Sequence, residues 1–195
     1  MEEKLVSILI PVYNRVDLVG KTIDSAINQT YKNIEIIIVD NCSTDGTWEL
    51  LRQYILIDNR IQIFRNDKNI GPMRNWARCL ENSNGEYLKF LWSDDTIHPN
   101  FILRCVNAFS NNPNIGFVYT RTMVKLPNQT LDPYRHGPEG EYSSKEFIEN
   151  AILKKDKLMP VSPGCALFRK IDISESLRID IPNPKNLDFS SFGAG

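Results

Sequence analysis

Apolar residues in the first half of the chain fall into short continuous runs separated by stretches with helical periodicity. The runs at 5–10, 34–39, 61–64 and 87–91 have the length of strands and are bounded by turn residues. Continuous apolar runs are typical of strands that are buried on both faces, as in parallel sheets. Hydrophobic residues recur every three or four positions after Val16, Trp48 and Met73, which indicates amphipathic helices between the strands.

The order of elements from residue 5 to residue 91 is therefore βαβαβαβ. This order predicts an α/β fold: a doubly wound, mainly parallel sheet with helices on both faces, in three α/β/α layers. Ligands of such sheets bind beyond the carboxyl ends of the strands. Pro11, Asp40 and the pair Asp94-Asp95 all fall at those ends, so we expect them at a common site.

The pattern predicts a further strand over 115–120 and is weaker after residue 120. Beyond that point it predicts a polar loop over 128–140 of the kind that shapes binding sites, and a strand that follows Pro163. Ser143 and Glu146 have the spacing of a capping box, which predicts a helix start. The last stretch, 181–195, is rich in Pro and Asn and stops without a closing element, from which we expect a truncated piece of a longer protein.

Composition excludes several classes of function. The chain has 195 residues, 42% of them hydrophobic, and a net charge of −1, so it can bury a sizeable core and has no basic footprint for nucleic acid. The two histidines and the scattered cysteines do not have the spacing of a zinc site, and free thiols indicate a reducing compartment. We find no signal peptide and no apolar stretch long enough to span a bilayer, which predicts a cytoplasmic protein.

Asp94 and Asp95 are the strongest chemical signal. Two adjacent carboxylates repel each other, and a divalent cation that shares its coordination with phosphate oxygens would offset this repulsion. The alternative is a solvated turn in which one Asp caps the following helix. The loop after the first strand has neither the Gly-x-Gly-x-x-Gly pattern nor a P-loop, so bound phosphates would need another source of positive charge.

Four segments, in order, resemble the motifs of family 2 glycosyltransferases, which have the GT-A fold. Val6–Arg15 is similar to the opening strand and loop, and Ile36–Thr47 is similar to the second motif. Asn69–Gly71 with Arg74-Asn75 resembles the third motif, and Gly85–Asp95 resembles the last strand with its metal site. The resemblance covers roughly the first 110 residues, and four ordered motifs are far more specific than any one alone.

The resemblance implies a donor site for a nucleotide sugar. Asp40 would accept a hydrogen bond from the imide N–H of uracil or thymine. Asp95 would ligate Mn²⁺ or Mg²⁺ at the diphosphate, and Asp94 would bind the ribose or assist the metal. The other substrate-binding positions would be Pro11 and Tyr13 around the base, Asn69, and Arg74 near the diphosphate.

The chain departs from the family at Trp92, where many relatives carry an acid. We expect Trp92 to pack at the end of its strand, which leaves the metal to Asp94 and Asp95. His98 would either add a ligand or simply lead into the helix that begins after Pro99.

The resemblance further implies an inverting displacement, in which a carboxylate base deprotonates an acceptor hydroxyl that attacks the anomeric carbon. Residues 1–110 would form the donor-binding half and 111–195 the acceptor-side half. Asp188 is the candidate base; alternatively, the base follows the Gly-containing stretch 192–195, beyond the end of this chain. The donor would be a UDP-sugar in preference to a dTDP- or GDP-sugar, and the acceptor a glycan or a lipid-linked sugar.

Two other functions stay open. The chain could be a non-catalytic nucleotide-sugar-binding domain of a larger protein. Nucleotidyl transfer to a sugar phosphate also uses such a sheet with a metal, but it usually requires a Gly-rich basic loop, which the segment 11–15 is not. Lys154, Lys155 and Lys157 would either contact anionic lipid heads at a membrane surface or form a solvated helix end.

Overall fold

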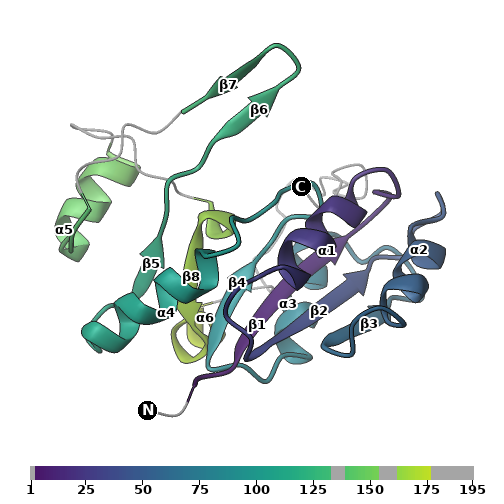
Figure 1. Cartoon of the computed structure of the whole chain (residues 1–195), viewed down its shortest axis with the longest axis horizontal. Helices are drawn as coiled ribbons and strands as arrows, with labels where there is room; N and C mark the ends of the chain where they lie inside the picture. Colours follow the sequence, from purple (N-terminus) through teal and green to yellow (C-terminus); the bar gives the residue numbers. More distant parts are fainter. Residues whose placement is uncertain (1–2, 133–138, 154–161, 177–195) are drawn as a thin grey trace, which may run out of the picture. The chain divides into compact units, whose positions relative to one another are not determined.

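The computed structural model describes residues 3–132, 139–153 and 162–176, which form two compact units (Figure 1). The first unit contains the described parts of 1–118 and 167–195, and the second is formed by the described parts of 119–166. The first unit carries the mixed sheet and its helices. The functional division expected at residue 110 stays a prediction.

A six-stranded sheet has the strand order β3-β2-β1-β4-β8-β5. The first four strands are parallel, with Val6 beside Ile34 and Val12 beside Asp40, whereas β8 runs antiparallel to β4. This confirms the mainly parallel α/β fold. The strands are β1 (Val6–Val12), β2 (Ile34–Asp40), β3 (Ile61–Arg65), β4 (Tyr87–Phe90), β5 (Phe117–Tyr119) and β8 (Ala166–Arg169).

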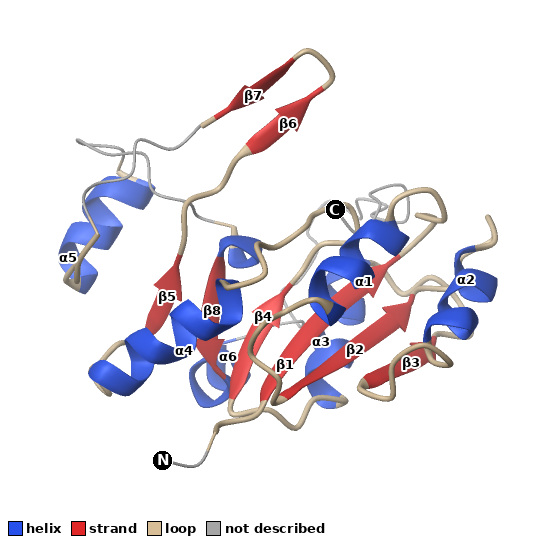
Figure 2. Ribbon diagram, in the orientation of Figure 1, coloured by secondary structure: helices blue, strands red, loops and turns tan. Residues whose placement is uncertain are grey.

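Helices cover both faces of the sheet (Figures 1 and 2). Alternate residues of the buried strands point to opposite faces. Ile8 and Ile10 therefore pack with α1 and α4, while Leu9 packs with α3. The arrangement confirms the three α/β/α layers. One layer holds α1 (Val19–Ile27), α2 (Thr47–Tyr54) and α4 (Phe101–Asn111), and the other holds α3 (Pro72–Glu81) and α6 (Lys170–Ser176).

A buried polar cluster ties the amino ends of the strands together. Glu35 of β2 accepts hydrogen bonds from the Ser7 hydroxyl at 2.6 Å and from the backbone N–H groups of Asn84 at 2.5 Å and Gly85 at 3.2 Å. Burial raises the pKa of Glu35, but these hydrogen bonds outweigh it and the net pKa is lowered. Gly85 has to be glycine, since a Cβ there would lie 2.5 Å from the Ser7 backbone nitrogen. The cluster fixes where β1, β2 and β4 begin.

The second half agrees in part with the sequence. Ser143 and Glu146 form the expected capping box at the start of α5 (Ser144–Phe147), which continues into a π-helical turn, η1 (Ile148–Ile152). A short 3₁₀ turn, η2 (Pro163–Cys165), leads into β8 as expected. The polar loop expected over 128–140 was wrong at its start, because β7 (Gln129–Leu131) pairs there with β6 (Val124–Leu126). Both strands are short and exposed, so no apolar run marked them.

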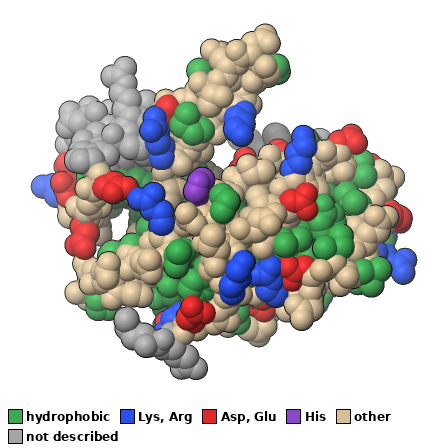
Figure 3. Space-filling view, in the orientation of Figure 1, with side chains coloured by type: hydrophobic (Ala, Val, Ile, Leu, Met, Phe, Trp, Pro, Cys, Tyr) green, Lys and Arg blue, Asp and Glu red, His purple; other side chains and the backbone are tan. Residues whose placement is uncertain are grey.

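Charged side chains of both signs are interspersed over the face of the molecule drawn in Figure 3. Within the residues that the structure describes, no helix has both the length and the hydrophobicity needed to cross a membrane.

Candidate functional site

The candidate site lies at the carboxyl ends of β1, β2, β3 and β4. Asp40 is the last residue of β2, and the register places it between Val12 of β1 and Arg65 of β3. Asp94 and Asp95 follow the end of β4, where Leu91 still pairs with β1 through its N–H and the Leu9 carbonyl at 2.9 Å. Parallel pairing therefore brings residues from distant parts of the chain to one edge.

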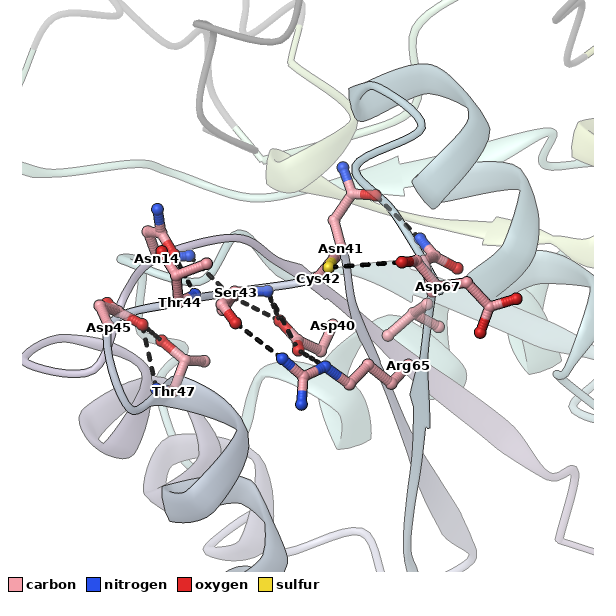
Figure 4. A network of polar contacts seen from close by, with 12 residues as sticks. Asn14, Asp40, Asn41, Cys42, Ser43, Thr44, Asp45, Thr47, Arg65 and Asp67 are labelled. Carbon is pink, nitrogen blue, oxygen red and sulfur yellow. Dashed lines mark hydrogen bonds and ion pairs between the residues drawn. The ribbon is translucent and has the colours of Figure 1, made fainter.

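Asp40 is fully buried and held by two neighbours (Figure 4). Its carboxylate accepts from the Ser43 hydroxyl at 2.5 Å and the Ser43 N–H at 3.1 Å, and its second oxygen lies 3.2 Å from Nε of Arg65. Arg65 also donates to the Ser43 carbonyl at 2.8 Å and lies over the Trp48 ring. Burial raises the pKa of Asp40, while Ser43 and Arg65 act to lower it, and the net pKa is raised.

Side chains bind the loop after β1 to the loop after β2 (Figure 4). Asn14 donates its N–H to Ser43 Oγ and accepts from the Thr44 N–H through Oδ1, both at 2.9 Å. Farther along, the Arg15 N–H donates to Thr47 Oγ1 at 2.9 Å. Asn14 and Cys42 have positive φ, 51° and 66°, a conformation that is rare for residues other than glycine. The two loops are thus fixed to each other in a specific geometry.

A cluster of asparagines supports Asp40 from the other side. Asn41 donates to Oδ1 of Asn69 at 2.8 Å and accepts from the Ile70 N–H at 3.0 Å. Asn66 donates both to Asn41 at 2.9 Å and to Asn75 at 2.8 Å, and Asn75 donates to a carbonyl of β2. Asn69 also accepts from the Gly71 N–H. The loop before α3 is thereby anchored to the end of β2.

Asp94 and Asp95 are both solvent-exposed residues. Partial burial of its carboxyl group raises the pKa of Asp95, the negative charge of Asp94 adds to this, and the buried Lys89 acts against it. The Asp95 N–H donates to the Trp92 carbonyl at 3.0 Å, which forms a tight turn. Trp92 itself is buried, with its ring centroid 4.7 Å from that of Trp76, and this confirms it as a strand-end packing residue.

The pair is suited to a divalent cation. Burial is the main cause of the raised pKa of Asp95, and a bound cation would relieve the second cause, the negative charge of Asp94. In the described ranges, no group of three or more His, Cys, Asp or Glu side chains could hold a metal by itself. Mg²⁺ is commonly bound through one or two carboxylates, with the other ligands from substrate phosphates and water, and Asp94 and Asp95 fit that pattern.

The remaining predicted residues are placed as follows. Pro11 is buried within β1, and Tyr13 is half-buried just beyond its end. Arg74 is exposed on the first turn of α3. His98 accepts from the Asn100 N–H through Nδ1, as a residue that leads into α4. Asp188 lies outside the described residues.

The sequence missed two side chains that the structure brings to this edge. Arg65 forms an ion pair with Asp40. The sequence could have indicated this pair, because Arg65 directly follows the apolar run 61–64 and the ends of β3 and β2 lie side by side. Arg15 lies with Nε 4.0 Å from a carboxylate oxygen of Asp94. No periodicity could reveal this second pair, because it joins two loops 79 positions apart in the chain.

A family model described as "Glycosyl transferase family 2" matches residues 7–177. The chain belongs to glycosyl transferase family 2. The match includes all the strand ends that form the site, and it confirms the resemblance of the four motifs.

Two curated glycosyltransferases are similar to this chain over much of its length. The putative teichuronic acid biosynthesis glycosyltransferase TuaG of Bacillus subtilis is 32% identical over 92% of this chain and 66% of its own length. The UDP-Glc:alpha-D-GlcNAc-diphosphoundecaprenol beta-1,3-glucosyltransferase WfaP of Escherichia coli is 46% identical over 72% of this chain and 55% of its own length. The chain thus spans between about half and two thirds of these relatives.

Among solved structures, Staphylococcus aureus TarS 1-349 in complex with UDP-GlcNAc superposes with a TM-score of 0.65 and 20% identity, and the match covers 89% of this chain and 47% of that chain. This likeness confirms the α/β fold.

Proposed function

We propose that this chain is the donor-binding part of a glycosyltransferase that moves a sugar from a UDP-sugar to a hydroxyl group of a cell-envelope glycan or lipid-linked acceptor. The observation that carries the proposal is the continuous set of contacts along the sheet edge. It runs from Asp40 through Ser43 to Asn14, and from Arg15 to Asp94. These contacts support the proposal because they join the loop beside Asp40, where the base would bind, to the loop beside Asp94, where the diphosphate would bind.

The base would lie against Tyr13 and be recognised at Asp40. Because Ser43 and Arg65 cover Asp40 in the free protein, a base that bonds to its carboxylate has to displace one of their contacts. Asn69 would contribute by holding the loop before α3, since its side-chain oxygen already accepts two hydrogen bonds. Pro11 would shape the strand end beneath the base.

Asp95 would hold Mn²⁺ or Mg²⁺, whose charge stabilises a diphosphate leaving group. Asp94 would either assist Asp95 as a second ligand or bind the ribose. In the transfer itself the acceptor oxygen bonds to the anomeric carbon as the bond from that carbon to the diphosphate breaks. The acceptor proton passes to a carboxylate base. Asp188 remains the candidate for that base within this sequence.

The names of the relatives favour the donor and the acceptor class. The WfaP name specifies UDP-glucose and a diphosphoundecaprenol-linked sugar, and the TuaG name specifies a teichuronic acid. By analogy the acceptor of this chain is a sugar on a lipid carrier or a growing polysaccharide. Peripheral association with the inner face of the membrane, through Lys154, Lys155 and Lys157 outside the described residues, belongs to the same proposal.

Sugar transfer provides the test. The protein is incubated with radiolabelled UDP-glucose, UDP-GlcNAc or UDP-galactose, Mn²⁺ and a synthetic GlcNAc-diphosphate-lipid, and the lipid product is measured. The proposal predicts transfer from one donor and its loss when EDTA is added. Tight, metal-dependent UDP binding without any transfer would instead support a non-catalytic nucleotide-sugar-binding domain.

A further inference from the structure

The position of Arg15 is fixed by its own backbone. Its N–H donates to Thr47 Oγ1 at 2.9 Å, and its carbonyl accepts from the N–H groups of Leu18 at 3.0 Å and Val19 at 2.9 Å, at the start of α1. One terminal nitrogen of the guanidinium group is also held in place, because Nη1 donates a hydrogen bond to the Asn14 carbonyl at 3.1 Å. Arg15 is therefore a constrained side chain and not a freely moving surface arginine.

The Nε of Arg15 is left without an acceptor. It is buried from solvent and makes no hydrogen bond in the described structure, and the nearest carboxylate oxygen, Oδ2 of Asp94, is 4.0 Å away. That separation allows electrostatic attraction but is too long for a hydrogen bond. A buried donor without an acceptor is costly, so such a group calls for an explanation, and a bound ion or ligand is one of the few that satisfy it.

We propose that Arg15 binds the diphosphate of the donor, its guanidinium turning so that the Nε–H, which is shielded from solvent in the free protein, donates to a non-bridging phosphate oxygen. The inference rests on the proposed function and adds a residue to it. Two adjacent carboxylates contribute negative charge to this edge of the sheet, so positive charge beside them favours the approach of an anion. Arg15 supplies that charge next to Asp94, and a phosphate oxygen supplies the acceptor that Nε lacks.

Arg15 is better placed for this role than Arg74, which the motif resemblance indicated. Arg74 is exposed at the start of α3, and the described residues give it no side-chain contact with the carboxyl edge of β4. Arg15 instead lies 4.0 Å from a carboxylate oxygen of Asp94, and its N–H is bonded to Thr47 at the start of α2. A residue so anchored loses little conformational freedom when the diphosphate binds.

Calorimetric titrations with uridine and UDP in Mn²⁺ test the proposal. Arg15→Gln is expected to weaken UDP binding by roughly tenfold or more, the effect of one charge-assisted hydrogen bond, while uridine binding stays unchanged. Arg15→Lys is expected to lose most of the same affinity, because an ammonium has no donor at the Nε position. Arg52→Gln, at an exposed arginine of α2, is the matched control and should bind UDP like the wild type.

A second readout needs no variant. In wild-type protein the ¹⁵N–¹H signal of Arg15 Nε should shift on addition of UDP and stay in place with uridine. If the wild type binds UDP but the signal stays in place and Arg15→Gln binds equally well, Arg15 is only a counter-ion for Asp94 and the inference is overturned while the proposed function stands. If the wild type binds neither uridine nor UDP, the proposed function fails and the inference fails with it.

Discussion

Replacement of Arg65 by Gln should destabilise the fold in a strongly pH-dependent way. The substitution removes the cation 3.2 Å from the Asp40 carboxylate, the hydrogen bond to the Ser43 carbonyl and the contact with the Trp48 ring. Asp40 has no exposed surface, so water cannot replace the lost charge without a structural change.

The size of the effect follows from the two sides of this ion pair. Removing one partner of a fully buried pair costs roughly 3–5 kcal/mol, whereas an exposed pair contributes about 0–1 kcal/mol. Here Asp40 is 0% exposed but the Arg65 side chain is 36% exposed, and the Ser43 hydrogen bonds remain. We therefore expect a loss of about 2 kcal/mol at pH 7, or a fall in Tm of roughly 4–8 °C for a chain of this length.

The pH dependence has a definite sign. Burial raises the pKa of Asp40 in the folded protein, so ionisation of Asp40 lowers the free energy of unfolding. This loss of stability grows as pH rises from the ordinary pKa of an aspartate to the raised pKa of the folded state. Arg65 holds that pKa down, so its loss increases the penalty at neutral pH. Below about pH 3.9 Asp40 is protonated in both states, and the wild type and Arg65→Gln should differ least there.

Urea unfolding at several pH values measures the difference, and a double-mutant cycle with Asp40→Asn isolates the pair. In the Asp40→Asn background, Arg65→Gln should cost less than about 1 kcal/mol, because no buried charge is left unpaired. A cost of about 2 kcal/mol that is the same at pH 3.5 and pH 7, and is unchanged by Asp40→Asn, would show that Arg65 acts through packing alone.

Two further predictions concern the amino ends of the strands. Glu35→Gln should lower stability by roughly 1–3 kcal/mol in chemical unfolding at pH 7, because its carboxylate accepts from Ser7 and Asn84 in a buried site. The pKa of Glu35 is lowered in the folded protein, so the ionised carboxylate stabilises the fold above its ordinary pKa of about 4.3, and this stabilisation is lost as pH falls through the folded pKa. A stability difference between the wild type and Glu35→Gln that does not change with pH would contradict this prediction. Gly85→Ala should lower Tm markedly in calorimetry, because the added Cβ would lie 2.5 Å from the backbone nitrogen of Ser7. Gly116→Ala is the control and should change Tm little, because no neighbouring atom lies within 4 Å of a Cβ at that position. Equal changes in Tm for the two variants would refute the close approach of Gly85 to Ser7.

Much of the first half could be predicted from the sequence because local pattern and tertiary environment agree there. Every residue of β1 and β2 is buried, so the apolar runs that favour strands are also the runs that the helices cover. The same agreement placed Asp40 and Asp94 at one edge, since parallel pairing follows from helical crossovers between strands. The loop after β1 differed at both ends, because β1 continues through Pro11 to Val12 and α1 begins at Val19 and not at Val16.

Features that depend on contacts between loops could not be predicted. The pairing of Arg15 with Asp94 joins segments that are close only after the sheet has formed. The hairpin of β6 and β7 is held by backbone hydrogen bonds between exposed strands, so its side chains carry no burial pattern. Asn41 and Asn75 belong to two of the motifs that resemble the family, but only the fold shows that both are bonded to Asn66.

The most direct test of the central claim is calorimetric titration of the protein with UDP, with and without Mn²⁺, beside the Asp95→Asn variant. Glu49→Gln, at an exposed carboxylate of α2, serves as the control. The donor-site account predicts UDP binding that requires Mn²⁺, is lost in Asp95→Asn and is retained in Glu49→Gln. Equal binding with and without Mn²⁺, or an Asp95→Asn variant that binds like the wild type, would contradict it and leave the aspartate pair as a solvated turn.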